Sequence, residues 1–311
     1  MNIRPFKSSD TENLIDLWNR ALPIDKINLS VLERKVLLDP NFDEQGLLVY
    51  ETNDTLVGFI LSIVRKMPME GVGLQEDKGW ITAMGVDPAY RRSGIGSKLL
   101  NEAIKFFRSK NRKEILVSPY VPNYFVPGID VKSYSVGMRF FKKFGFDEIS
   151  HPLSMDANIV GLKIPQEILE TEKKLRNEGI YISFYERDDL LPYLKFQSKF
   201  MPGDWLELAR RNLMELTKGN FEADQIVLAK KNDKIIGFCQ YEHEHFGPIG
   251  VIDEYQSKGV GTVLLANALQ QMIKKGIHNA WVLWTSDKAA KIYKKFGFKE
   301  TRRFAIMRKK L

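Results

Sequence analysis

The stretch "RRSGIGSKLL", residues 91–100, is a basic turn with two glycines that leads directly into an amphipathic run. A second stretch of the same pattern, "QSKGVGTVLL", occupies residues 256–265. In both, a glycine-rich turn is followed by apolar residues at helical spacing. The recurrence of so specific a pattern predicts that the chain contains two copies of one structural unit.

The similarity extends well beyond the two turns. "MGVDPAYRRSGIGSKLL" (84–100) aligns without gaps with "IGVIDEYQSKGVGTVLL" (249–265), and "FFKKFGF" (140–146) corresponds to "IYKKFGF" (292–298). The beginnings of the copies, "IRPFKSSD" and "ISFYERDD", both read as a strand entering a helix. The first copy has extra residues within 118–139, and we expect this insertion to lie near the cleft.

Each copy is expected to contain the same elements in the same order. A strand and a helical region precede two strands joined by "ETND" or "KKND", which are typical hairpin turns. A third strand, the glycine turn, a long helix, another strand, a short helix and final strands follow. The pattern predicts an α+β fold with two tandem domains, each a mixed sheet flanked by helices. We expect an N-terminal domain at 1–163, a linker helix at 164–179 and a C-terminal domain at 180–311.

The composition is that of a folded, water-soluble protein. Of 311 residues, 44% are hydrophobic, yet no apolar run approaches the ~18 residues that a membrane span needs. The N-terminus lacks the apolar core of a signal peptide, and the single Cys239 cannot form an internal disulfide. These features favour the cytoplasm. The net charge is +8, but the cations are scattered in short groups, so we expect nucleic acid to be an unlikely partner.

The glycine turn has the properties of an anion site. A strand–turn–helix presents free backbone N–H groups at the positive end of the helix dipole. Glycine lets a ligand approach the backbone closely, and Arg91, Arg92, Gln256 and Lys258 could add side-chain donors. The turn is neither a Walker phosphate loop nor a dinucleotide fingerprint, because it lacks the GK[ST] ending and a third glycine.

A strand ending in valine and followed by [RQ]-x-x-G-x-G resembles the GNAT superfamily of N-acetyltransferases. "IYKKFGF" is similar to the tyrosine-bearing helix of that family, and the two copies together resemble its tandem members. The resemblance implies splayed sheets that bind acetyl-CoA, with the pyrophosphate on the glycine turn and the pantetheine arm along the strand before it. Gly85 and Gly250 would then mark a bulge or a close approach in that strand.

The residues implied in cofactor binding form matching sets in the two copies. In the first copy they are Met84, Gly85, Val86, Arg91, Arg92, Gly94, Ile95, Gly96 and Ser97. In the second copy they are Ile249, Gly250, Val251, Gln256, Lys258, Gly259, Val260, Gly261 and Thr262. The first turn is the more positive, since Asp253 and Glu254 precede the second.

Tyr293 occupies the position of the family's general acid, which the resemblance implies protonates the leaving thiolate. The first copy has Phe141 there, which has no proton to donate, and Tyr134 of the insertion is a weaker substitute. One copy thus looks better suited to binding and the other to catalysis. Resemblance to mycothiol synthase, another tandem GNAT enzyme, implies a similar division between a degenerate N-terminal domain and an active C-terminal one.

The candidate bases lie in "YEHEH", residues 241–245. Strand alternation would place Tyr241, His243 and His245 on one face and the two glutamates on the other. We select Glu242 and His243 as the candidate general bases, although any Glu or His of the run could relay a proton. We expect no metal, because the two histidines have no third ligand at a recognisable spacing.

Three functions are compatible with these features. The leading prediction is an acetyl-CoA-dependent N-acetyltransferase in which a primary amine, of a small molecule or a peptide, attacks directly in a ternary complex. A non-catalytic acyl-CoA sensor would keep the glycine turns and lose the acid. An aminoacyl transferase that uses charged tRNA would suit the positive charge but would not need two pyrophosphate turns. The sequence identifies neither the acceptor nor the oligomeric state.

Overall fold

The structure is a computed structural model that describes residues 2–311, and its chain forms two compact units. Unit 1 contains the residues up to Pro68, Gly73–Pro152 and Arg303–Leu311. Unit 2 contains Met69–Val72 and Leu153–Arg302. The units therefore divide the chain differently from the contiguous ranges 1–163 and 180–311, because each unit includes a segment from the other copy.

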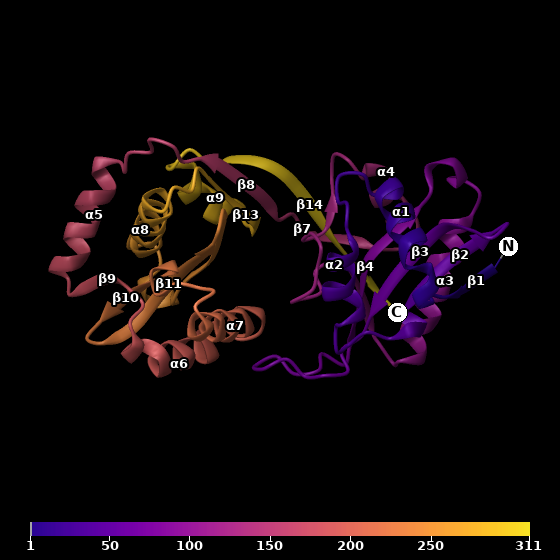
Figure 1. Ribbon diagram of the computed structural model, residues 1–311, viewed down its shortest axis with the longest axis horizontal. Helices are drawn as coiled ribbons and strands as arrows, with labels where there is room; N and C mark the ends of the chain where they lie inside the picture. The colour runs from indigo at the N-terminus through magenta and orange to yellow at the C-terminus, as the bar shows by residue number, and fades with distance from the viewer. Residues whose placement is uncertain (1) are drawn as a thin grey trace. The chain divides into compact units, whose positions relative to one another are not determined.

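Unit 1 is a mixed sheet with helices on both faces (Figure 1). Its strand order is β1-β2-β3-β4-β5-β14, in which β4 and β5 are parallel and the other pairs are antiparallel. The main elements are β1 (Asn2–Pro5), α1 (Thr11–Ala21), β2 (Leu47–Thr52), β3 (Thr55–Ile63), β4 (Lys78–Val86), α3 (Ile95–Ser109), β5 (Glu114–Val117), α4 (Ser135–Lys143) and β14 (Lys299–Lys310). The short elements are α2 (Leu29–Leu32), β6 (Ile129–Asp130) and β7 (Asp147–Ser150), of which β6 and β7 pair with β14.

Two hydrophobic cores hold unit 1 together, one on each face of the sheet. Leu99, Ala103 and Phe107 of α3 pack with Phe141 of α4 on one face. On the opposite face, Trp18 of α1 belongs to the second core. The apolar positions of α3 recur every three or four residues, so one stripe of the helix is buried while the rest remains in water.

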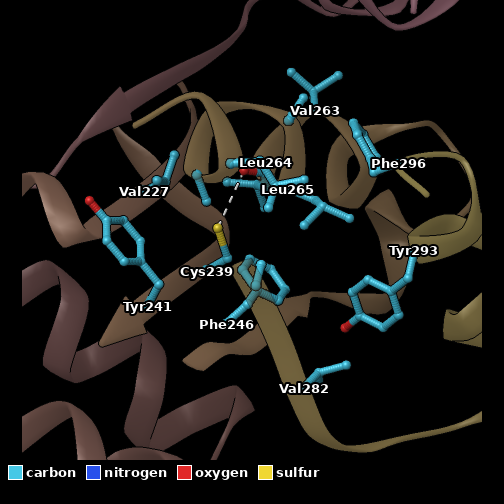
Figure 2. Packing of buried hydrophobic residues seen from close by; sticks show 14 of the residues in the cluster. Val227, Cys239, Tyr241, Phe246, Val263, Leu264, Leu265, Val282, Tyr293 and Phe296 are labelled. Carbon is cyan, nitrogen blue, oxygen red and sulfur yellow. Dashed lines mark hydrogen bonds between the residues drawn. The ribbon is translucent and has the colours of Figure 1, made fainter. Parts of the chain in front are cut away.

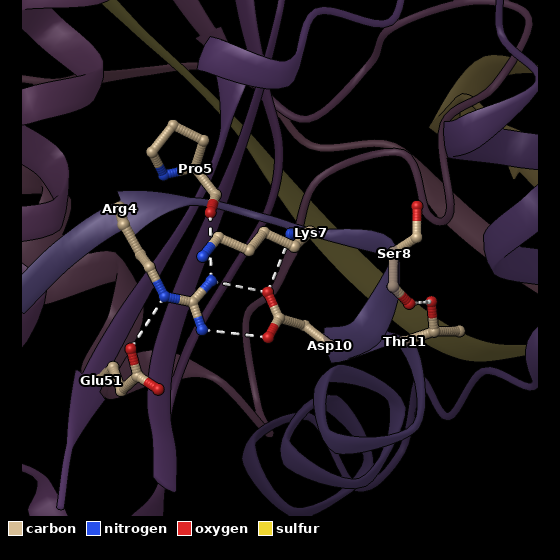
Figure 3. A network of polar contacts seen from close by, with 7 residues as sticks. All are labelled: Arg4, Pro5, Lys7, Ser8, Asp10, Thr11 and Glu51. Atoms are coloured by element: carbon tan, nitrogen blue, oxygen red, sulfur yellow. Dashed lines mark hydrogen bonds and ion pairs between the residues drawn. The ribbon is translucent and has the colours of Figure 1, made fainter. Parts of the chain in front are cut away.

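A partly buried ion-pair network fixes the junction between β1 and α1 (Figure 3). Arg4 donates to both carboxylate oxygens of Asp10, at 2.7 and 3.0 Å, and its Nε donates to Glu51 of β2 at 2.8 Å. Asp10 also accepts from the backbone N–H of Lys7, and this interaction closes the turn. The network ties the start of α1 to two strands, which sets the position of the helix over the sheet.

Unit 2 repeats this architecture. Its strand order is β8-β13-β12-β11-β10-β9, and only β12 and β13 pair in parallel. Helix α8 covers one face of the sheet, and α6 and α7 cover the other (Figure 1). The elements are β8 (Leu153–Asn158), α5 (Gln166–Asn177), β9 (Ile180–Phe184), α6 (Leu190–Phe200), α7 (Asp204–Lys218), β10 (Ile226–Lys231), β11 (Lys234–Glu242), β12 (His245–Val251), α8 (Val260–Lys274), β13 (Asn279–Thr285) and α9 (Asp287–Lys294).

Three segments account for the division of the chain into these units. β8 lies within the range 1–163 expected for the N-terminal domain but pairs with β13 of unit 2. Residues 307–310 of β14, at the end of the second copy, pair with β5 of unit 1. Residues 69–72 belong to unit 2, where Glu70 forms an ion pair with Arg210 of α7 at 2.8 Å. The helix expected at 164–179 is present as α5, and its Ile168 and Leu175 are buried in the unit 2 core.

Candidate active site

In unit 1, β4 and β5 pair for four residues and then separate. Their register runs from Lys78 opposite Glu114 to Ile81 opposite Val117, where β5 ends. β4 continues to Val86 and pairs there only with β3. A register shift between β3 and β4 leaves Thr82 as a bulged residue at the point of separation. The last part of β4 therefore has a free edge at a fork in the sheet.

Unit 2 contains the equivalent fork. The parallel strands β12 and β13 are registered at His245 opposite Trp281, and the N–H of Trp281 donates to the carbonyl of Glu244 at 2.9 Å. β12 then continues to Val251 beside β11 alone. A register shift between Phe246 and Ile249 places a bulge in this part of β12. A free strand edge at a fork can accept hydrogen bonds from an extended ligand, as a further strand would.

Gly85 and Gly250 are sites of close approach, and neither is the bulged residue. A Cβ at Gly85 would lie 2.7 Å from the Phe59 ring and 2.8 Å from the Cβ of Ala21. A Cβ at Gly250 would lie 2.6 Å from the Cε of Met201 and 3.1 Å from the Phe238 ring. Of the two alternatives, a bulge or a close approach, the structure shows the close approach at both glycines. They allow the residues that cover the sheet to pack directly on the free-edged strand.

The two glycine turns have the same backbone conformation. Gly94 and Gly259 lie just before α3 and α8, with φ of 85° and 91°. Two residues earlier, Arg92 and Ser257 also have positive φ, 67° and 61°. The first helical hydrogen bonds run from Lys98 to Gly94 and from the N–H of Val263 to the carbonyl of Gly259. The amides before Lys98 and Val263 therefore have no acceptor within their helices and point out of the helix ends.

These free amides belong to the residues that the sequence analysis assigned to the pyrophosphate. They are Ile95, Gly96 and Ser97 in unit 1, and Val260, Gly261 and Thr262 in unit 2. A Cβ at Gly96 would lie 3.5 Å from Met84, and one at Gly261 would lie 3.7 Å from Val251. A single methyl group would thus fit, but a larger side chain would occupy the space over the amides. Both turns have the shape and polarity of a phosphate cradle.

The first residue of each [RQ]-x-x-G-x-G motif, Arg91 or Gln256, stabilises the turn by a hydrogen bond to the preceding strand. The Nε of Arg91 donates to the carbonyl of Val86 at 3.1 Å, and the Nε2 of Gln256 donates to the carbonyl of Val251 at 3.1 Å. Lys258 lies over the Tyr255 ring at 5.0 Å, whereas Arg92 is exposed at the turn. The donors best placed for an anion are therefore the backbone amides, with Arg92 beside them in unit 1.

Tyr293 lies below the fork of unit 2. It is 4% exposed, its ring contacts Phe246 edge-on at 5.9 Å, and its hydroxyl lies on the side of the ring that faces Phe246 and Val282 (Figure 2). Phe246 and Val282 are the first residues beyond the His245–Trp281 pair. Burial raises the pKa of Tyr293 to about 12, although a hydrogen bond with Thr285 opposes the shift. The phenol therefore keeps its proton at neutral pH.

Unit 1 has no hydroxyl at the position equivalent to Tyr293, because Phe141 of α4 is buried there in an aromatic group with Phe146. Tyr134 is half-buried and precedes α4 as its N-cap residue. The insertion that begins at Ser118 starts where β5 ends at the fork, and it packs inward. Tyr120 contacts Trp80 at 5.5 Å, and Phe125 contacts Trp18 at 4.8 Å.

The alternation expected for residues 241–245 is wrong. β11 ends at Glu242 and β12 begins at His245, so His243 and Glu244 form a two-residue turn. His243 has φ of 52° and is exposed. Glu242 is also exposed and forms an ion pair with Arg211 of α7 at 3.3 Å. A turn consumes two residues without continuing the pleat, so His243 and His245 do not share a strand face.

His245 follows the turn as the first residue of β12 and lies at the fork, opposite Trp281. Its imidazole stacks on the Trp281 ring with centroids 4.3 Å apart and planes at 30°. Burial lowers the pKa of His245 below its usual 6.5, as does Arg211, while Glu242 opposes them. From the sequence, His245 is only one of several possible bases in the run 241–245. The His243–Glu244 pair between two apolar strands was the signal for a hairpin turn that places His245 at the start of the next strand.

Among residues 2–311, no group of three or more His, Cys, Asp and Glu side chains is placed to hold a metal ion. Within the same range, no helix is both long enough and apolar enough to cross a membrane. The candidate site in each unit combines a strand fork and a helix N-terminus, to which unit 2 adds a buried tyrosine.

Comparison with known families agrees with this geometry. Residues 11–146 match the model of the acetyltransferase (GNAT) family, and residues 222–300 match that of an acetyltransferase (GNAT) domain. The chain belongs to the GNAT family. It is a tandem GNAT protein with an α+β fold in each unit, as the repeated turn predicts, and the family generally uses acetyl-CoA for acyl transfer.

Solved structures similar to this tandem GNAT protein share its fold at low sequence identity. A glucosamine N-acetyltransferase region of a fungal multi-domain GH3 β-N-acetylglucosaminidase has a TM-score of 0.79 at 16% identity, over 99% of this chain and 38% of that chain. A GCN5-related N-acetyltransferase from Sphaerobacter thermophilus has a TM-score of 0.71 at 14% identity, covering 99% and 95% of the two chains. A tandem GNAT protein from the clavulanic acid biosynthesis pathway has a TM-score of 0.64 at 12% identity, covering 99% and 98%.

Proposed function

We propose that unit 2 is an acetyl-CoA-dependent N-acetyltransferase that acts on a primary amine by direct attack in a ternary complex. The observation that carries this proposal is the presence, in one unit, of a free strand edge, a helix N-terminus with free amides and a buried protonated tyrosine below the same fork. Unit 1 has the first two features and Phe141 in place of the third. We therefore propose that unit 1 binds acyl-CoA without carrying out this chemistry.

The residues of unit 2 fit the parts of acetyl-CoA. The amides of Val260, Gly261 and Thr262 would hold the pyrophosphate, where the dipole of α8 favours negative charge. The free edge of β12 would pair with the pantetheine amides, and a backbone N–H of that edge would stabilise the oxyanion. Tyr293 would donate its proton to the leaving thiolate. Because the pKa of Tyr293 is about 12, the hydroxyl is fully protonated when the thiolate forms.

We propose a small-molecule or peptide amine as the acceptor. Glucosamine is a suitable first acceptor to assay, because the fungal region that shares this fold is described as a glucosamine N-acetyltransferase. The single cysteine, Cys239, is buried and cannot pair within the chain, which supports our placement of the protein in the cytoplasm.

The test is an acceptor screen on the full chain in which free CoA is measured with a thiol reagent. We expect CoA release that depends on an amine and is lost in Tyr293→Phe, and we expect co-purified CoA in the mass spectrum of the native protein. Co-purified CoA with no release for any amine would favour an acyl-CoA sensor. Release only with charged tRNA would instead establish an aminoacyl transferase.

A further inference from the structure

His245 occupies the apex of the unit 2 fork. It forms the registered parallel pair with Trp281, and beyond this pair β12 and β13 separate. Phe246, the next residue of β12, contacts the Tyr293 ring. His245 is therefore adjacent in the strand to the residue that contacts the proposed acid. Both lie where a thioester bound in the fork would be attacked.

The two groups lie on opposite faces of the sheet. Phe246 points into the core that contains α8 and Tyr293. Successive strand residues point to opposite faces, so His245 lies on the face covered by α6 and α7. Its cross-strand neighbour Glu242 lies on the same face and bonds to Arg211 of α7. An acceptor approaching from the α7 face would meet His245, while the leaving sulfur would lie toward Tyr293.

The surroundings hold His245 in one orientation and in the neutral form. Stacking on Trp281 at 4.3 Å restricts the ring, and His245 is partly buried. The charged groups that act on it are Glu242 on β11, which favours the imidazolium, and Arg211 on α7, which disfavours it. These two charges are already paired with each other at 3.3 Å, so burial dominates and a neutral imidazole remains at pH 7.

We propose that His245 is the general base of unit 2, in place of Glu242 or His243. This inference rests on the proposed acetyltransferase function and specifies the proton path. His245 takes one proton from the acceptor ammonium, so that the free amine can attack the thioester carbon. A C–N bond forms and the C–S bond breaks, and Tyr293 protonates the thiolate. The second proton lost from nitrogen restores Tyr293, and the imidazolium returns its proton to water.

The kinetic test compares single variants of the full chain with acetyl-CoA and glucosamine, or with whichever amine the screen identifies. We expect His245→Gln to lose roughly 10²- to 10⁴-fold in kcat, the usual range for a general base, with little change in KM for acetyl-CoA. His278→Gln is the matched control, because His278 is exposed just before β13 and should leave turnover unchanged. We also expect free imidazole to restore part of the activity of His245→Ala, which a merely structural role would not allow.

A second measurement does not depend on turnover. The chain has four histidines, so their imidazole NMR signals can be assigned by single substitutions. We expect His245 to titrate below 6.5 and its signals to shift when acetyl-CoA is added, while those of His278 stay in place.

The outcomes separate the two proposals. Unchanged turnover in His245→Gln, or a loss in His243→Gln or Glu242→Gln instead, would overturn the assignment of the base and leave the acetyltransferase intact. Saturation of unit 2 with acetyl-CoA without any shift at His245 would also overturn it. A complete absence of acetyl-CoA binding at unit 2 would overturn both proposals.

Discussion

Arg91 and Gln256 have the same role in the two turns, because each donates a 3.1 Å hydrogen bond to the carbonyl of the valine that ends the preceding strand, Val86 or Val251. Arg91 also donates to Ala21 at the end of α1, and Gln256 donates to Asp253. The longer, charged side chain thus reaches a helix, and the shorter one stays within its turn. In both units the motif residue holds the strand end against the helix N-terminus, so that the free amides are pre-positioned.

This relationship predicts different effects for the two arginines of the first turn. Arg91→Ala should lower the free energy of unfolding by about 1 kcal/mol, because hydrogen bonds to two carbonyls are lost. Arg92→Ala should leave stability unchanged and weaken acetyl-CoA binding to unit 1 about fivefold, as expected for an exposed, screened cation near a phosphate. Urea unfolding and calorimetry measure the two effects. Equal losses of acetyl-CoA affinity in the two variants would show that Arg91 breaks its hydrogen bonds to the Val86 and Ala21 carbonyls and binds the ligand instead.

Gly96→Val and Gly261→Val should remove acetyl-CoA binding from units 1 and 2, respectively, with little effect on folding. The Cβ itself has room, 3.5 Å from Met84 or 3.7 Å from Val251, but the branched side chain would fill the space over the free amides. Calorimetric stoichiometry shows which unit has lost its site, and only Gly261→Val should abolish turnover. Alanine at either position is the control for helix propensity.

Gly94→Ala and Gly259→Ala test the backbone rather than the ligand. Both glycines have positive φ, which should cost alanine about 1–2 kcal/mol. A Cβ at Gly94 has no neighbour within 4 Å, whereas one at Gly259 would lie 2.5 Å from the Cγ2 of Thr171 on α5. Gly259→Ala should therefore be the more destabilising variant in urea unfolding. Thr171→Ala should relieve the excess, and a double variant no more stable than Gly259→Ala would refute the contact.

Tyr293→Phe should lower kcat by roughly 10²- to 10⁴-fold while acetyl-CoA affinity stays nearly constant. The phenyl ring keeps its contacts with Phe246 and Phe298, so packing is preserved. Tyr241→Phe is the matched control, because Tyr241 is 1% exposed in the same core and lies elsewhere in it (Figure 2). Loss of activity in the control, or wild-type turnover in Tyr293→Phe, would return Tyr293 to a packing role.

The pH dependence of turnover should show an acidic limb and no alkaline limb from the enzyme up to about pH 10. Because the pKa of His245 is lowered, the base is neutral above 6.5 and activity falls only as pH drops below that value. Tyr293, with a pKa near 12, remains protonated throughout. Because the pKa of His245 is lower in the folded protein than in the unfolded chain, the unfolded chain is protonated first as pH falls. His245 should therefore reduce stability as pH falls below 6.5, and His245→Gln should lessen that loss.

Much of the fold and part of the site could be predicted from local patterns. The glycines before α3 and α8 need positive φ, and the stripe that follows them needs a helix, so the turn is encoded within a few residues. The same holds for "ETND" and "KKND", whose Asn and Asp residues have φ between 48° and 59°. The position of Tyr293 was indicated by the resemblance of "IYKKFGF" to the tyrosine-bearing helix of the family. His245 could not be found in this way, because its role depends on where β13 begins to pair with β12.

The sequence by itself determined that the chain contains two copies of a GNAT unit, where their glycine turns lie and that only the second copy has a tyrosine at position 293, where the first has Phe141. Those features depend on backbone conformation and periodicity, which neighbouring residues specify. Only the tertiary structure decided that β8 completes the sheet of unit 2, that β14 enters the sheet of unit 1 and that residues 69–72 pack against α7. A strand pattern encodes which face is buried but not which edge it joins, because any free edge offers the same backbone hydrogen bonds. Packing between segments far apart in the chain makes that choice, and with it the position of His245 on Trp281.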